Sequence, residues 1–125
     1  MFENTKAFSS FAVDDLGRAK EFYGQTLGVR VTEDTAMGLL TLHIEGGAQI
    51  LVYPKGDHVP ATYTVLNFPV PDIDQAVEGL AARGVTFERY PQFEQDDKGV
   101  SRAEGPAIAW FKDPAGNTLA VLQVD

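Results

Sequence analysis

The hydrophobic and polar positions in the first half of the chain change period along the sequence, from strand-like to helical and back. The helical stretch carries apolar residues at Leu16, Ala19, Phe22, Tyr23 and Leu27. Their spacing lies near ~3.6 residues, which gives one apolar face. Asp14 or Asp15 precedes the stretch as a helix cap, and Gly28 follows it as a stop, because a short acceptor side chain satisfies free N–H groups and glycine tolerates a positive φ.

Strand-like runs lie on both sides of this predicted helix. They are Lys6–Val13, Val29–Glu33, Leu39–Glu45 and Ala48–Tyr53. Gly46-Gly47 separates the last two runs and indicates a hairpin. The first half therefore has the predicted element order βαβββ.

The second half repeats this order. Asp72 caps a predicted helix whose apolar face is formed by Ile73, Ala76, Val77, Leu80 and Ala81. The expected strands are Ala61–Val70, Val85–Tyr90, Ala107–Lys112 and Thr118–Val124. Asp113-Pro114-Ala115-Gly116-Asn117 has the composition of a turn between the last two. Gln92–Gly105 is polar, so we expect a long loop with more freedom to move than the rest of the chain.

Short matches between the two halves indicate an internal repeat. Val13-Asp14-Asp15-Leu16 corresponds to Val70-Pro71-Asp72-Ile73, and each helical stretch ends at Gly-Val. The predicted fold class is therefore α+β, with two βαβββ modules in a single domain. Module 1 spans about 1–54, a linker spans 54–60, and module 2 spans about 61–125.

The composition excludes several classes of function. The chain has 125 residues, a formal net charge of −8 and no cysteine. Binding to a phosphate backbone needs clustered positive charge, so we expect no nucleic-acid partner. No apolar run approaches the ~18 residues of a membrane-spanning helix, and the N-terminal residues do not resemble a secretory signal. We therefore expect no membrane partner and a cytoplasmic location.

The opening and closing motifs resemble those of the vicinal oxygen chelate superfamily. The opening motif runs from Phe11 to Gly28, and the closing motif runs from Phe111 to Leu119. This group includes glyoxalases, extradiol dioxygenases, fosfomycin resistance enzymes and bleomycin-binding proteins. The resemblance covers nearly the whole chain. It implies two modules that form a curved, cup-shaped mixed sheet, with helices on the convex face, in a homodimer.

In the metal-dependent members, this resemblance implies a divalent cation held by His or Glu on the first and fourth strands of each module. Carried over from the shared motifs, these positions fall on Phe8, Leu51, Val65 and Ala120. None of these side chains has an oxygen or nitrogen donor, whereas a divalent ion needs about three or more. A shift of the alignment by one residue brings in no histidine or carboxylate. We therefore predict that the protein has no metal cofactor.

If those positions face the cup, strand alternation brings further residues to the same surface. The expected ligand-binding residues are Phe8, Ser10, Gln49, Leu51, Tyr53, Tyr63, Val65, Asn67, Trp110 and Ala120. An apolar floor with aromatic and amide groups at its rim is typical of a small-molecule pocket. The same aromatic side chains would also suit a filled interior.

His43 is the histidine that this alternation turns toward the cup, provided that Leu42 and Ile44 face the helices. Its imidazole could act as an acid or base, or it could hydrogen-bond a ligand. The sequence identifies no carboxylate that would orient the ring, so a structural role for His43 is favoured over a catalytic one.

These observations leave more than one function open. We predict a metal-independent protein that binds a small, partly apolar organic molecule, such as an antibiotic, in the cup. The acidic composition gives weak support to a cationic ligand. The alternative is a lyase, isomerase or dioxygenase-like enzyme with a displaced metal site or with His43 as acid or base. A collapsed cup in a dimerisation or partner-binding domain is the third hypothesis.

Overall fold

The chain divides into two compact units, Met1–Pro60 and a second unit that begins at Ala61. The computed structural model describes residues 1–47, 49–103 and 105–124. Ala48, at the start of one predicted strand, and Glu104, in the predicted long loop, lie outside these residues. No helix in the described ranges is both long and apolar enough to cross a membrane.

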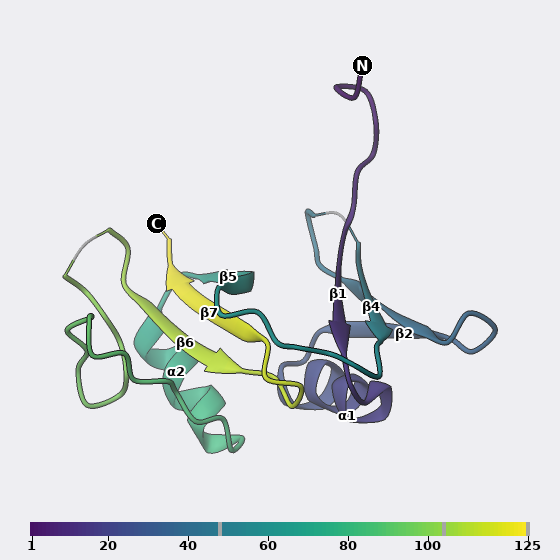
Figure 1. Cartoon of the computed structure of the whole chain (residues 1–125). Coiled ribbons are helices and arrows are strands. Elements are labelled where there is room, and N and C mark those ends of the chain that lie inside the picture. The colour runs from purple at the N-terminus through teal and green to yellow at the C-terminus, as the bar shows by residue number, and fades with distance from the viewer. Residues whose placement is uncertain (48, 104, 125) are drawn as a thin grey trace. The chain divides into compact units, whose positions relative to one another are not determined.

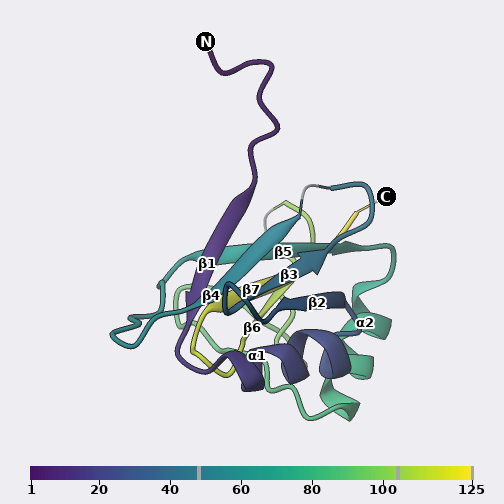
Figure 2. The same ribbon diagram turned by 90° about the vertical axis from the view of Figure 1, so that its right-hand side faces the viewer.

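The first unit combines one sheet with a short helical segment (Figure 1). Its strands are β1 (Ser9–Val13), β2 (Arg30–Asp34), β3 (Leu39–His43) and β4 (Ile50–Pro54). They lie in the order β1-β4-β3-β2, which can be followed in Figure 2, with β1 parallel to β4 and the other pairs antiparallel. The helical segment comprises α1 (Leu16–Glu21) and η1 (Phe22–Thr26). The predicted βαβββ order is confirmed for this unit.

The core of the first unit lies between its sheet and the helical segment. The sheet register aligns Phe11, Val52 and Leu40 across β1, β4 and β3. Tyr23 of η1 is fully buried, and its ring lies 5.8 Å from that of Phe11. Burying each such large apolar side chain stabilises the fold by about 1.5–3 kcal/mol. Side chains at the intervening strand positions therefore point to the opposite face of the sheet.

The helical segment of the first unit changes type, which the apolar spacing did not predict. α1 ends at Glu21, and the N–H of Leu27 donates to the carbonyl oxygen of Phe22 at 2.9 Å, in a π-helical turn. Such a turn inserts one residue into a helix, so a pattern based on a regular spacing does not register it. The predicted ends are confirmed. Asp15 accepts a hydrogen bond from the N–H of Arg18 at 3.0 Å, and Gly28 has a φ of 74°.

The second unit contains β5 (Thr64–Val70), α2 (Ile73–Ala82), β6 (Ile108–Lys112) and β7 (Thr118–Gln123). Its strands lie in the order β5-β7-β6, with β5 parallel and β6 antiparallel to β7. Figure 1 shows α2 along one side of this sheet. Asp72 caps α2 as predicted, because its Oδ1 accepts from the N–H of Gln75 at 3.1 Å. The register aligns Leu66, Leu119 and Phe111, and the last two are fully buried.

The predicted strand Val85–Tyr90 is wrong. This segment contributes an isolated bridge from Phe87 to Phe111 and one hydrogen bond from the N–H of Glu88 to the carbonyl oxygen of Trp110, at 2.8 Å. Gln95 supplies the physical reason. Its Oε1 accepts from the N–H of Tyr90 at 2.8 Å, and its Nε2 donates to the carbonyl oxygen of Glu88 at 2.9 Å. A side chain thus satisfies backbone groups that a ladder would otherwise pair, and the sheet has three strands.

Both predicted turns between antiparallel strands form. In the β3–β4 connection, Gly46 has a φ of 73° and the N–H of Gly47 donates to the carbonyl oxygen of Ile44. In the β6–β7 connection, Oδ1 of Asp113 accepts from the N–H groups of Ala115 and Asn117, at 3.0 and 2.9 Å. Aspartate is favoured in such turns because its side chain bonds the backbone that follows it.

Candidate functional site

One face of the first unit's sheet, which we call the open face, lies opposite the helical segment and holds several of the predicted ligand-binding residues. The β1–β4 register pairs Ser10 with Leu51 and Ala12 with Tyr53, and β3 places Thr41 beside Leu51. Ser10 is exposed, Leu51 is half-buried and Tyr53 is 39% exposed. The open face is therefore accessible in part and mixes apolar with hydroxyl groups.

A pocket of about 420 Å³ lies on the first unit, where the segment before β1 passes the β3–β4 connection. Its lining residues are Lys6, Ala7, Phe8, Gly47, Gln49 and Leu51. Ligand pockets commonly fall in the range of ~300–1,000 Å³. Phe8 is 64% exposed, so its ring is accessible to a ligand. The structure thus brings three predicted residues, Phe8, Gln49 and Leu51, together in one pocket.

His43 lies on the open face and touches this pocket through Gln49. It alternates in β3 with the fully buried Leu42 and Leu40. Its Nε2 lies 2.9 Å from the hydroxyl oxygen of Thr32, and its Nδ1 lies 3.4 Å from Nε2 of Gln49. The partners that orient the imidazole are therefore a hydroxyl group and an amide. The sequence did not reveal Thr32, because its position beside His43 depends on the β2–β3 register.

In the second unit, the register aligns Asn67, Ala120 and Trp110 across β5, β7 and β6. Asn67 is exposed, Trp110 is half-buried and Ala120 is fully buried. These three predicted residues share one face of the sheet, because each is adjacent in its strand to a member of the row Leu66, Leu119 and Phe111 on the other face.

Two other predicted residues of the second unit do not join this row. Val65 lies at the irregularity between Thr64 and Leu66, where the β5–β7 register shifts, so no β7 partner is aligned with it. Tyr63 precedes β5 and is 71% exposed. The alternation that assigned both residues to the common face fails here, because a bulge changes which face a side chain occupies.

Tyr90 and Phe93 are aromatic neighbours of Trp110 that the sequence analysis did not assign to the site. The Tyr90 ring meets the indole edge-on, at 5.4 Å between centroids, and the Phe93 ring stacks on it at 5.0 Å. Phe93 is the one aromatic residue of the mostly polar segment Gln92–Gly105, and that isolation was a signal for a buried or binding role. The resulting aromatic cluster, Tyr90, Phe93 and Trp110, occupies the face predicted to bind a ligand.

The hydroxyl group of Tyr90 lies in a polar setting. Burial raises the pKa of Tyr90 above its ordinary value, and the carboxylate of Glu88 raises the pKa further. Lys112 and a hydrogen bond with Thr118 act in the opposite direction. Lys112 and Glu88 form an ion pair at 3.3 Å. The aromatic cluster therefore ends in a set of polar groups that could orient a ligand.

A metal ion does not fit the positions that the family resemblance assigns to its ligands. The four positions carry Phe8, Leu51, Val65 and Ala120, whose side chains offer no lone pair to a cation. Within the described ranges, no group of three or more histidines and carboxylates could hold a metal ion. The absence of a metal cofactor stays a prediction.

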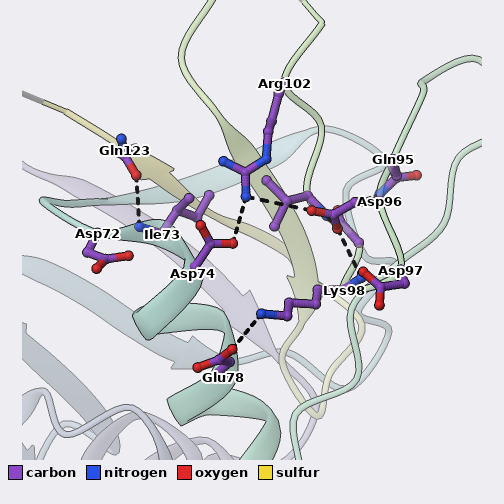
Figure 3. A network of polar contacts seen from close by, with 12 residues as sticks. Asp72, Ile73, Asp74, Glu78, Gln95, Asp96, Asp97, Lys98, Arg102 and Gln123 are labelled. Carbon is purple, nitrogen blue, oxygen red and sulfur yellow. Dashed lines mark hydrogen bonds and ion pairs between the residues drawn. The ribbon is translucent and has the colours of Figure 1, made fainter.

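A second pocket, of about 330 Å³, lies in the loop that follows Tyr90 and includes Gln95, Asp96 and Arg102 among its lining residues. Figure 3 shows that Arg102 is bound by the carboxylates of Asp74 and Asp96, at 2.6 and 3.6 Å. Lys98 forms an ion pair with Glu78 of α2. Because Arg102 and Lys98 are already paired with carboxylates, the network holds the loop against α2 and is not a free anion site.

Comparison with known proteins identifies relatives of the whole chain. Residues 7–121 match the model of the family described as the Glyoxalase/Bleomycin resistance protein/Dioxygenase superfamily. The uncharacterized protein YurT of Bacillus subtilis (strain 168) is 28% identical over 134 residues, which cover 92% of this chain and 95% of YurT.

Two solved structures have a similar fold. A member of the glyoxalase/bleomycin resistance protein/dioxygenase superfamily from Sphaerobacter thermophilus DSM 20745 is 25% identical, with a TM-score of 0.71 over 96% of this chain and 98% of that chain. TnmS3, an antibiotic binding protein from Streptomyces sp. CB03234, is 21% identical, with a TM-score of 0.71 over 98% of each chain. Since the family match spans most of the sequence, the chain belongs to the Glyoxalase/Bleomycin resistance protein/Dioxygenase superfamily.

Proposed function

We propose that the protein binds a small, partly apolar organic molecule without the help of a metal ion. The observation that carries this proposal is the pocket of about 420 Å³ on the first unit. Phe8 and Leu51 give it apolar contact surface, Gln49 gives it an amide and Lys6 gives it an ammonium group. Apolar walls with a few orienting polar groups are the usual constitution of a small-molecule site.

An antibiotic is one class of ligand that this proposal includes. TnmS3, whose fold is similar, is an antibiotic binding protein. The formal net charge of −8 favours cationic molecules over long distances, although Lys6 opposes this preference at the pocket itself. Trp110 adds less to such a site, because the ring of Phe93 stacks on its indole. The proposed assembly is a homodimer, as the family resemblance implies, and size-exclusion chromatography with light scattering tests it.

A lyase or isomerase activity that uses His43 as acid or base is less well supported. A general acid or base needs a ring nitrogen within reach of the substrate. Both ring nitrogens of His43 already contact protein groups, Nε2 at Thr32 and Nδ1 at Gln49. The binding function therefore agrees better with the geometry around this imidazole.

A thermal-shift screen of small organic molecules tests the proposed function. A ligand that binds only the folded protein raises the melting temperature according to its affinity and concentration. We expect the shifts to persist in excess chelator and to shrink in Phe8→Ala. Met37→Ala is a matched control, because Met37 is also exposed, at 72%, but lies outside the pocket. Shifts that require an added divalent ion and vanish with chelator would contradict the proposal.

A further inference from the structure

A chain of side-chain contacts runs across the open face from β2 to the pocket. The hydroxyl oxygen of Thr32 lies 2.9 Å from Nε2 of His43, and Nδ1 of His43 lies 3.4 Å from Nε2 of Gln49. Gln49 lines the pocket, whereas Thr32 and His43 do not. Thr32 and His43 can therefore influence a ligand through the orientation of the Gln49 amide.

The donor and acceptor atoms of these three side chains determine which atoms carry the protons in this row of contacts. The amide nitrogen of Gln49 can donate but cannot accept a hydrogen bond, so Nδ1 of His43 must be the acceptor. In a neutral imidazole the other nitrogen then carries the proton. The Nε2–H of His43 therefore donates to the hydroxyl oxygen of Thr32.

This arrangement leaves the amide oxygen of Gln49, a residue that lines the pocket, without a partner among the described residues. We propose that His43 and Thr32 are positioning residues that turn the carbonyl oxygen of Gln49 toward the pocket, so that it selects ligands carrying an N–H or O–H donor. The proposal rests on the proposed binding function and narrows its ligand class. A molecule of equal shape with an acceptor or an apolar group at the same place binds less well.

The first test needs no ligand and uses the full ¹⁵N-labelled chain. Long-range proton–nitrogen correlation spectra report which ring nitrogen of His43 is protonated, and His58→Gln leaves the signals of His43 alone in the spectrum. We expect an unprotonated Nδ1 and a protonated Nε2, with a correlation through the hydrogen bond from Gln49. Gln49→Glu replaces the donor with a pure acceptor and should move a proton onto Nδ1. A protonated Nδ1 in the unchanged chain would overturn the proposal.

The second test compares indole with benzofuran, two bicyclic probes of similar shape that differ in an N–H donor. One added hydrogen bond corresponds to roughly a three- to tenfold difference in affinity. We expect indole to bind more tightly by this factor, and we expect Gln49→Leu to abolish the difference. Calorimetric or NMR titration of the full chain measures both dissociation constants.

Variants at Thr32 separate positioning from a general effect on the sheet. Thr32→Val keeps the β-branched shape but removes the acceptor for Nε2–H, so the preference for indole should fall toward unity while the affinity for benzofuran stays the same. Thr32→Ser restores the hydroxyl group and should restore the preference. Thr41→Val is the matched control, because Thr41 is paired with Thr32 on the same face but lies outside the contact chain.

The outcomes distinguish the inference from the function on which it rests. Equal affinity for the two probes, or a preference that Gln49→Leu leaves intact, would overturn the donor selectivity and leave the pocket standing. Failure of both probes to bind, in the presence and absence of chelator, would overturn the proposed pocket together with its selectivity.

Discussion

The phenyl ring of Phe93 stacks on the indole ring of Trp110, with 5.0 Å between the ring centroids and 22° between their planes. Tyr90 meets the same indole edge-on, at an angle of 79°. Phe93 comes from the long loop, whereas Trp110 belongs to β6. The loop therefore places an aromatic ring where a planar ligand would otherwise meet the tryptophan.

Removal of the Phe93 ring should change the surroundings of the single tryptophan of the chain. In Phe93→Ala we expect the fluorescence emission of Trp110 to move to longer wavelengths, because water reaches the indole. The loss of an aromatic pair should lower the free energy of unfolding by about 0.5–1.5 kcal/mol. Phe2→Ala is the control, since Phe2 is 75% exposed. An unchanged emission maximum would contradict the stack.

Substitution of Gln95 should destabilise the folded protein. Its amide makes three hydrogen bonds to backbone groups, at Tyr90, Glu88 and Gly99. Gln95→Leu removes all three at similar volume, and at about 1 kcal/mol each the free energy of unfolding should fall by about 2–3 kcal/mol.

Urea denaturation and amide hydrogen exchange at Tyr90 measure this effect. Gln92→Leu makes the same substitution at an exposed position nearby in the loop and should change the stability by less than about 0.5 kcal/mol. Equal effects of the two variants would show that the amide contacts of Gln95 do not hold the loop.

Stability at alkaline pH should depend on Tyr90. Its pKa is raised in the folded protein, chiefly by burial, above the value of 10.0 that an isolated tyrosine has. The unfolded chain therefore loses this proton first, so the contribution of Tyr90 is fully present below about pH 10 and declines as the pH rises through the folded pKa. Denaturant titrations from neutral pH to beyond pH 10 measure how steeply the free energy of unfolding declines with pH.

Tyr90→Phe keeps the ring and removes the ionisable group. We expect this variant to decline less steeply with alkaline pH than the unchanged chain, apart from a constant loss caused by the missing hydrogen bond to Thr118. Tyr63→Phe, at a residue that is 71% exposed, should leave the slope as it was. If the free energy of unfolding declined equally steeply with pH in Tyr90→Phe and in the unchanged chain, the raised pKa of Tyr90 would be refuted.

Two glycines should respond to alanine with opposite signs. Gly99 has a φ of 94°, and an added Cβ would lie 3.0 Å from Cβ of Phe87, so Gly99→Ala should cost about 1–3 kcal/mol. Gly79 lies within α2 with open space around an added Cβ, so Gly79→Ala should stabilise by about 0.5–1 kcal/mol. Thermal or urea denaturation measures the free energy of unfolding of both variants. Changes of the same sign in the two variants would contradict the prediction.

The sequence predicted those elements whose signals are local. Asp15 and Asp72 cap their helices, and the apolar period identifies the buried faces, because caps and amphipathic spacing act within a few residues. The family resemblance assigned Leu51 to the cup and strand alternation then added Ser10, and the register pairs these two residues on the face opposite the core of the first sheet. The family resemblance then supplied the fold class, which the family match confirms.

The features that the sequence did not predict depend on contacts between distant segments. Val85–Tyr90 has the composition of a strand, but its backbone is satisfied by the side chain of Gln95. The contact of His43 with Thr32 follows from the register of β2 against β3. Phe93 reaches Trp110 only because the loop folds back on the sheet. The periodic pattern of one segment does not specify which residues of another strand pair with it, nor the path that a loop takes.

The irregular segment beside β6 has a consequence for the behaviour of the protein at high concentration. Ser101 exchanges two backbone hydrogen bonds with Ile108, and Glu88 donates one to Trp110. These bonds occupy polar groups on the outer margin of β6, which would otherwise be open to a strand of a neighbouring molecule. Three backbone groups of β6, the N–H and carbonyl oxygen of Ile108 and the carbonyl oxygen of Trp110, are therefore not available for the intermolecular pairing that begins fibrillar aggregation.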